Sequence, residues 1–263
     1  MSDEPDKART DISEILDSCL YTPGQLNVRM IEAQDGEPRI QIRLDLGILQ
    51  LHTTGRPDGQ RPQGFESYLD YLESRIDSTT QDDDPEQHTT RTLSEDDCRI
   101  VREEAAQYYH RYMALLLLED FAGVVRDTTR NLRALDLCAR HAANEHDRQV
   151  LEPYRPYILM IRARALAGQA LKDGESKAAI LAIDQGLDAL KGYFSHTGKP
   201  EDFDASNEVQ MLQSMRDALV PKLPVSQKAE LRQRLQAAIE RENYELAAIL
   251  RDELRMMGEI GGA

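Results

Sequence analysis

The chain has 263 residues, enough for one or two domains with a core of ordinary size. Its 32 basic and 47 acidic residues give a net charge of −15, and this average field repels a phosphate backbone. Tryptophan is absent and aromatic residues make up only 5%, which weakens any mode of binding that depends on base stacking. This charge disfavours direct nucleic-acid binding unless the fold creates a local basic patch.

The cysteines and the apolar runs indicate a cellular compartment. Cys19, Cys98 and Cys138 are widely separated and form no CxxC pair, which predicts buried thiols in a reducing compartment and no disulfide framework or zinc site. The first residues lack the basic and apolar regions of a secretion signal. The longest strongly apolar run, from Met113 to Leu118, is too short to cross a bilayer. We expect a cytoplasmic protein without a membrane segment.

Residues 1–78 read as a small α+β module. A short helix is expected over 11–20, and two strands of alternating apolar and polar residues follow, joined by turn residues at 35–38. The alternating apolar residues are Leu26, Val28 and Met30 in the first strand and Ile40, Ile42, Leu44, Leu46 and Ile48 in a long second strand. A two-stranded hairpin is only marginally stable alone, so it should pack on a helix, gain a strand or pair with a second copy of the chain.

The loop over residues 53–64 lies between the second strand and a helix, where phosphate-binding loops occur. It lacks the Gly-Lys-Ser/Thr ending of such loops, and its prolines remove amide donors. A structural turn or a contact loop for a partner is favoured over nucleotide binding, with Arg56 and Arg61 as the locally basic pair. The helix that follows, over 65–77, has an apolar side formed by Phe65, Tyr68, Leu69, Leu72 and Ile76.

Residues 79–93 contain three consecutive aspartates, Asp82 to Asp84, and almost nothing apolar, so we interpret them as an acidic linker and a domain boundary. A helical domain is predicted over 94–222, opened by Ser94 as the N-cap with acidic residues in the first turn. The expected helices in this domain and beyond it cover 95–118, 120–144, 147–172, 175–194, 204–220, 226–241 and 244–257.

One pair of these helices carries small residues at the spacing of a tetratricopeptide-type unit. The positions are Ala163, Leu166, Ala167, Ala170, Gly174, Ala179, Ile183 and Gly186. Small side chains there let two antiparallel helices approach closely, but no clean 34-residue period is present. The predicted fold class is mainly α: an antiparallel helical array, either tetratricopeptide-like or plain, between the α+β module and a C-terminal helical hairpin.

The sequence shows no catalytic constellation. Its histidines are His52, His88, His110, His141, His146 and His196. They form no HExxH zinc-binding motif, and the sequence shows neither the nucleophile elbow nor the Ser-His-Asp arrangement of known hydrolases. We therefore expect a non-enzymatic protein that uses neither a metal nor a cofactor.

The C-terminal residues 226–257 have the most specific pattern. Two amphipathic helices are predicted on either side of a polar corner at 241–243, which makes an antiparallel hairpin. The apolar positions are Leu231, Leu235, Ala238 and Ile239 in the first helix and Ala247, Leu250, Leu254 and Met257 in the second, with Tyr244 at its entry. Its six basic and six acidic residues cancel between 227 and 257, which suits helix-to-helix docking better than DNA binding.

With its Ala238-Ile239 pair, Glu242, Tyr244-Glu245, Ala247-Ala248 pair and Leu250-Arg251-Asp252 run, this hairpin resembles the UVR motif of the excision-repair proteins UvrB and UvrC. The resemblance implies a docking surface for a partner protein and transfers no catalysis. Related hairpins occur in Clp-type ATPases and in activators of protein arginine kinases, but the zinc-binding CxxC pairs of the latter are missing here.

The sequence thus predicts an adaptor that binds a protein partner, or a second copy of itself as a homodimer, through this hairpin. An accessory factor in nucleotide excision repair and a regulator of a Clp-type protease or kinase system are the alternatives that the resemblance leaves open. The residues expected to contact the partner are Leu231, Leu235, Ile239, Tyr244, Ala247, Leu250, Arg251 and Leu254.

Overall fold

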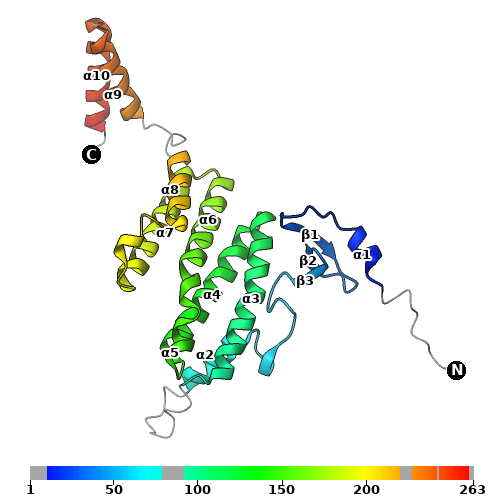
Figure 1. Ribbon diagram of the computed structural model, residues 1–263. Coiled ribbons are helices and arrows are strands. Elements are labelled where there is room, and N and C mark those ends of the chain that lie inside the picture. Colours follow the sequence, from blue (N-terminus) through cyan, green and yellow to red (C-terminus); the bar gives the residue numbers. More distant parts are fainter. Residues whose placement is uncertain (1–10, 79–91, 220–226, 242, 261–263) are drawn as a thin grey trace, which may run out of the picture. The chain divides into compact units, whose positions relative to one another are not determined.

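The computed structural model describes residues 11–78, 92–219, 227–241 and 243–260 of the chain (Figure 1). It divides the chain into two compact units, Met1–Asp217 and Ala218–Ala263, which are described separately below. The first unit contains a small sheet and an array of helices, and the second is a helix pair. This mainly helical architecture confirms the predicted fold class.

The sheet has three antiparallel strands in the order β1-β2-β3, one more than the sequence predicts. A short helix, α1 (Ser13–Asp17), precedes β1 (Asn27–Glu32), β2 (Pro38–Leu44) and β3 (Gly47–His52). The long second strand expected over 40–48 is wrong, because the chain turns at Asp45 and Leu46 and pairs Leu44 with Gly47. A two-residue loop with Asp in it is a common hairpin connection, and here it outweighs the apolar alternation. Leu46 is 93% exposed at the tip as a result.

The central strand β2 is covered on both faces. Ile40 and Ile42 are fully buried on one face. On the other face Arg29 Nε donates to Gln41 Oε1 at 2.8 Å, and Gln41 Nε2 donates to Gln50 Oε1 at 2.8 Å, so a polar ladder crosses all three strands. The third strand therefore supplies the stabilisation that a two-stranded hairpin lacks.

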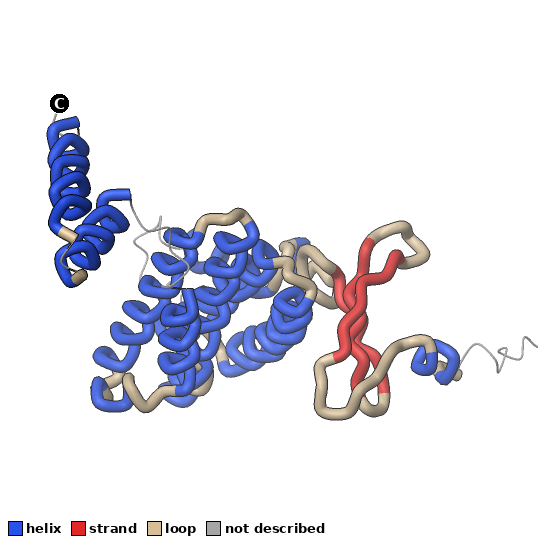
Figure 2. The backbone as a smooth tube through the Cα atoms, turned by 90° about the horizontal axis from the view of Figure 1, so that it is seen from above, coloured by secondary structure: helices blue, strands red, loops and turns tan. Residues whose placement is uncertain are grey.

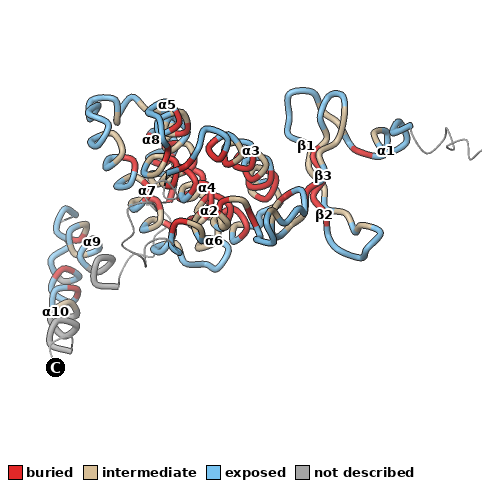
Figure 3. Tube along the Cα trace, turned by 90° about the horizontal axis from the view of Figure 1, so that it is seen from below, coloured by how far each residue is buried: buried red, intermediate tan, exposed pale blue. Residues whose placement is uncertain are grey.

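The helical part of the first unit is an array of side-by-side helices (Figures 1 and 2). Its helices are α2 (Tyr68–Ser78), α3 (Glu95–Leu117), α4 (Phe121–His141), α5 (Glu145–Gln149), α6 (Arg155–Lys172), α7 (Ser176–His196) and α8 (Asn207–Leu219). Short turns join α3 to α4 and α6 to α7, so these neighbours run antiparallel, and their buried residues lie on the sides that face one another (Figure 3). The predicted array of antiparallel helices is present.

Side-chain caps set several helix starts. Ser94 Oγ accepts from the Asp97 amide and the Asp97 carboxylate accepts from the Ser94 amide, which is the capping box that opens α3. At the start of α4 the Asp120 side chain accepts from the Gly123 amide, and at the start of α5 the Asn144 side chain accepts from the Asp147 amide. The continuous helix predicted over 147–172 is wrong: α5 ends at Gln149 and α6 begins at Arg155. Pro153 and Pro156 explain the break, because proline cannot donate a helical hydrogen bond and clashes with the preceding turn.

Helix α2 belongs to the same core as α3 and α4. Leu69, Leu72 and Ile76 of α2 pack in one buried cluster with Cys98 and Leu135 of these two helices. The sequence places a domain boundary after α2, at the acidic linker of residues 79–93, most of which lie outside the described residues, and this boundary stays a prediction. A single amphipathic helix must bury its apolar face against a neighbour, and α3 and α4 provide that surface.

Helices α6 and α7 approach closely at small residues, as the spacing predicts. Ala163, Ala179 and Ile183 are buried between them. A Cβ atom placed on Gly186 would lie only 2.4 Å from the Cβ of Ala163, so glycine is needed for this approach. The close packing of the pair is confirmed, and its assignment to the tetratricopeptide type stays a prediction.

Candidate partner-binding surface

The second unit is the hairpin of α9 (Gln227–Glu240) and α10 (Tyr244–Ile260), and Asn243 shapes its corner. The Asn243 amide donates to the Ala238 carbonyl at 2.9 Å, which closes the end of α9. The Asn243 side-chain oxygen accepts from the Leu246 amide at 3.2 Å and so caps the start of α10. One residue thus ends the first helix and begins the second.

The hairpin has a small core of its own. Ala238, Ala247 and Leu250 are buried, and Leu235 and Leu254 pack against them while remaining partly exposed. The methyl side chains of the two alanines let the helix backbones approach closely. This core holds the two helices together but contains few large side chains.

Four large apolar side chains stay exposed outside this core. The exposed fractions are 46% for Ile239, 69% for Tyr244, 38% for Leu246 and 64% for Ile249. Leu246 and Ile249 are three positions apart on α10 and therefore lie on one side of that helix. We call these four residues the outer apolar residues of the hairpin.

The predicted contact residues divide into distinct groups. Ile239, Tyr244 and Arg251 are exposed, so they are accessible to a partner. Ala247 and Leu250 face the other helix of the hairpin, while the side chain of Leu231 lies outside the described residues. The partly exposed Leu235 and Leu254 border the core. Contact of any of these residues with a partner stays a prediction.

Two outer residues, Leu246 and Ile249, were missed by the sequence interpretation. Each directly precedes a buried position, Ala247 or Leu250, and a helical projection with a wider apolar sector would have included both. Ala248 is exposed, whereas the adjacent Ala247 is buried in the hairpin core. A step of one residue turns a helix by roughly 100°, which carries Ala248 away from the face that Ala247 occupies.

The hairpin carries charged side chains of both signs. Among those described, the exposed ones are Arg232, Arg234, Glu240, Arg241, Arg251 and Asp252. Arg251 and Asp252 pair with each other at 3.1 Å. The described hairpin surface therefore mixes both signs around its outer apolar residues.

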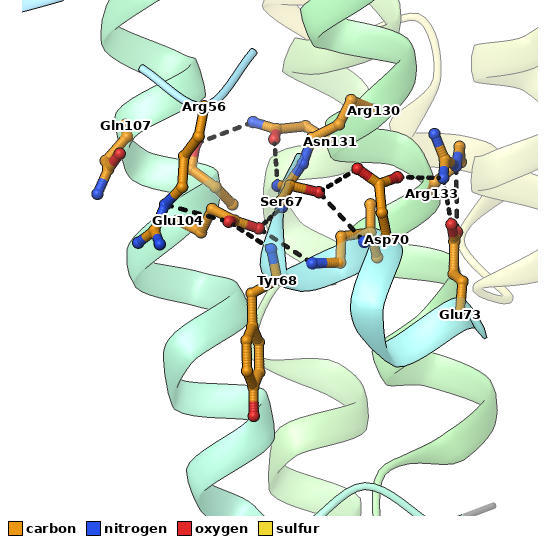
Figure 4. A network of polar contacts seen from close by, with 12 residues as sticks. Arg56, Ser67, Tyr68, Asp70, Glu73, Glu104, Gln107, Arg130, Asn131 and Arg133 are labelled. Carbon is orange, nitrogen blue, oxygen red and sulfur yellow. Dashed lines mark hydrogen bonds and ion pairs between the residues drawn. The ribbon is translucent and has the colours of Figure 1, made fainter. Parts of the chain in front are cut away.

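The loop of residues 53–64 uses one of its two arginines internally (Figure 4). Arg56 Nε lies 3.3 Å from a carboxylate oxygen of Glu104 and 3.3 Å from Asp58. Glu104 is fully buried and also accepts from the amides of Tyr68 and Leu69, at the start of α2, and from Arg130. These contacts tie the loop and α2 to α3, so Arg56 has a structural role and Arg61 is the exposed arginine of the pair.

The core also brings together two cysteines that are far apart in the sequence. Cys98 on α3 and Cys138 on α4 belong to one buried cluster, and Cys19 is buried near the sheet. All three are free thiols, as the sequence predicts. The Cys138 thiol donates a hydrogen bond to the Cys98 sulfur, and this bond and burial together raise the pKa of Cys138. The Cys138 thiol is therefore protonated at neutral pH and unreactive as a nucleophile.

Comparison with known proteins matches one family model, the UvrB/uvrC motif, to residues 226–260. The hairpin is a UVR motif. No curated protein and no solved structure matches the chain. The match covers the second unit and leaves the sheet and the helical array without an assigned family. Among the described residues, no helix is long and apolar enough to span a membrane.

Proposed function

We propose that the protein is a non-enzymatic adaptor of the cytoplasm that docks a partner protein through its UVR hairpin. The exposure of the outer apolar residues carries this proposal, because the hairpin leaves Ile249, Tyr244 and Ile239 in water after its own core is formed. Three free, buried cysteines suit a reducing compartment.

The energetics favour a partner with an apolar surface. Burying an exposed isoleucine or tyrosine side chain contributes roughly 1.5–3 kcal/mol. Several such residues on one small unit are enough to anchor an interface, since few residues carry most of the binding free energy. The surrounding charges of both signs favour a partner surface that also carries both. Because the basic and acidic residues of 227–257 cancel in number, the hairpin has no net charge to attract DNA.

The test compares two pairs of substitutions in the hairpin during quantitative affinity capture with the full chain. Ile239→Asp with Ile249→Asp removes two outer apolar side chains and adds two negative charges. Gln236→Asp with Ala248→Asp adds the same charges at exposed positions and keeps the outer residues. We expect the first pair to lose the partner and the second to retain it, with unchanged helix content by circular dichroism. Equal capture by both pairs would show that the hairpin is only structural.

The alternative functions make different demands on the same surface. An accessory factor in excision repair that touches DNA itself is favoured by the UVR match and opposed by the net charge of −15. A titration of labelled DNA at low salt decides it, since electrostatic binding is strongest there. If the signal of the labelled DNA does not change, the hypothesis that this protein binds DNA is refuted. Recovery of a Clp-type ATPase or a kinase in the capture experiment would instead support the regulatory alternative.

A second copy of the chain is one candidate partner for the outer apolar residues. A solution mass measurement at about 50 µM protein detects association of ordinary micromolar strength. We expect a dimer whose population falls in the Ile239→Asp and Ile249→Asp variant. A wholly monomeric mass for the unsubstituted chain would remove self-association.

A further inference from the structure

The first unit contains a cleft that the proposed adaptor function does not use. Helices α3, α4 and α6 and the connection between α5 and α6 enclose it, and its volume is about 600 Å³. Four tyrosines and several aliphatic side chains line it, together with the small residues Ala105, which is buried, and Ala106, which is exposed. This volume and mostly apolar lining are in the range of small-molecule sites.

The tyrosine rings form an aromatic wall along α3 and α6. Tyr109 makes an edge-to-face contact with Tyr112, with ring centroids 5.5 Å apart and an interplanar angle of 86°. It also contacts Tyr157 at 6.4 Å. Tyr154, at the entrance, is 61% exposed. Rings at these angles offer both faces and edges, so a planar aromatic group can pack against them.

The tyrosine hydroxyl groups at the cleft are hydrogen-bond donors. Tyr112 is only 1% exposed, yet within the described part of the chain no group hydrogen-bonds to its hydroxyl. Burial and the neighbouring Tyr157 and Tyr109 phenols raise the pKa of Tyr112, so its proton is retained at neutral pH. The Tyr157 hydroxyl donates to the Met113 sulfur at 3.3 Å, a weak acceptor.

The charged group that lines the cleft is a cation. Arg102 pairs with Asp147 through one terminal nitrogen, and no described group accepts from its other guanidinium nitrogens. The Asn131 amide is already occupied, since it donates to the Ala105 carbonyl at 3.0 Å and accepts from Arg130 at 3.1 Å. The open polar groups of the lining are therefore tyrosine hydroxyls, which donate or accept, and the positively charged donor Arg102.

We propose that this cleft binds a small aromatic ligand that carries a carboxylate or a similar anion. The aromatic ring packs against Tyr109 and beside Ala106, and the anion accepts from the free N–H groups of Arg102. Ten helical positions separate Arg102 from Tyr112, about 15 Å along α3, so the Tyr112 hydroxyl serves an acceptor at the other end of a longer ligand. A guanidinium has five donors, which lets Arg102 hold Asp147 and the ligand together.

Calorimetry with the full chain tests this with two probes, 2-naphthoate and its uncharged analogue 2-naphthylmethanol. We expect saturable binding of 2-naphthoate with a dissociation constant below about 1 mM, and binding of the alcohol at least tenfold weaker. A lack of saturable heat with 2-naphthoate, or equal affinity for both probes, would overturn the proposal.

Variants locate the bound probe. Ala106→Leu adds bulk to the lining of the cleft at an exposed position of α3, so it should abolish binding without affecting folding. The matched control Ala178→Leu, exposed on α7, should bind as the unsubstituted chain does. Retained binding by Ala106→Leu would place the probe elsewhere and refute the assignment.

A third variant tests whether the positive charge of Arg102 is needed to bind the anionic probe. Arg102→Gln should bind the two probes equally, and a persistent preference for 2-naphthoate would contradict the role of Arg102. Because this change leaves the buried Asp147 without its ion-pair partner, folding is checked first by circular dichroism. If the variant does not fold, the comparison of probes and the Ala106→Leu variant decide the proposal. The Ile239→Asp and Ile249→Asp hairpin variant should bind 2-naphthoate normally, which separates this proposal from the adaptor function.

Discussion

Two glycines on α7 should respond oppositely to the same substitution. In Gly186→Ala the new Cβ atom would lie 2.4 Å from the Cβ of Ala163 and 3.1 Å from Leu212. Non-bonded carbons prefer roughly 3.5–4.0 Å, so the overlap with Ala163 exceeds an ångström. The Leu212 side chain can rotate, but the Ala163 methyl group is fixed to the α6 backbone. Relief therefore requires α6 and α7 to move apart.

The change in the free energy of unfolding expected for Gly186→Ala is the sum of two opposing effects. Overpacking a core commonly costs about 1–3 kcal/mol, and a rigid neighbour puts this site at the upper end. Replacing glycine by alanine inside a helix stabilises the folded state by about 1 kcal/mol, because alanine has the higher helix propensity. The net expectation for Gly186→Ala is a loss of about 2 kcal/mol in the free energy of unfolding.

Gly192→Ala is the matched control because a Cβ atom at that position meets nothing within 4 Å. It lies in the same helix, so it should gain up to about 1 kcal/mol of stability from helix propensity alone. Urea unfolding followed by far-ultraviolet circular dichroism measures both variants. If Gly186→Ala were as stable as Gly192→Ala, the close approach of α6 and α7 at this glycine would be refuted.

Two further predictions concern charged side chains of α3. Arg111→Ala should lower the free energy of unfolding by about 3–5 kcal/mol, because Arg111 and Asp127 form a fully buried ion pair. Arg99→Ala, which removes an exposed ion pair on the same helix, should leave the urea midpoint unchanged, and equal effects would contradict the buried pair. Burial raises the pKa of Asp97, but hydrogen bonds from Tyr68, Arg75 and Ser94 outweigh burial and hold that pKa below its ordinary value. The stability that Asp97 contributes is present above the unfolded pKa of about 3.9 and lost as the pH falls through the folded value. Asp97→Asn should therefore flatten the decline in unfolding midpoint below about pH 5, and an unaltered decline would refute this contribution.

The sequence predicted the start of a helix correctly where neighbouring residues alone determine it. Ser94 and the acidic residues after it mark the start of α3 because a cap needs only neighbouring positions. The break before α6 could also have been predicted, because Pro153 and Pro156 are visible in the sequence. The continuous helix was predicted instead because apolar residues recur at helical spacing across these prolines. The third strand was hidden because Leu46 continues the alternation while Asp45 signals a turn.

Features that depend on long-range contacts could not be predicted in this way. Glu104 occupies an ordinary helical position among other acidic residues, and its burial beneath Arg56 and the start of α2 follows only from the packing of three segments. The cleft has the same origin, because its tyrosines lie on α3, on α6 and on the turn before α6. For the hairpin, the spacing predicted an apolar face on each helix. Which of these apolar residues form the internal core and which stay on the outer surface depends on how the two helices pack.

That division determines how substitutions in the UVR motif must be interpreted. Leu250 is 2% exposed and holds α10 against α9, whereas the adjacent Ile249 is 64% exposed and has no part in the hairpin core. Loss of a partner after a change at Leu250 would follow equally from a broken contact or from an unfolded hairpin. Loss after a change at Ile249, with helix content retained, can follow only from the surface. Ile249, together with Ile239 on the other helix, is therefore the position at which the docking hypothesis is decided, although the sequence prediction named Ile239 and the buried Leu250 but not Ile249.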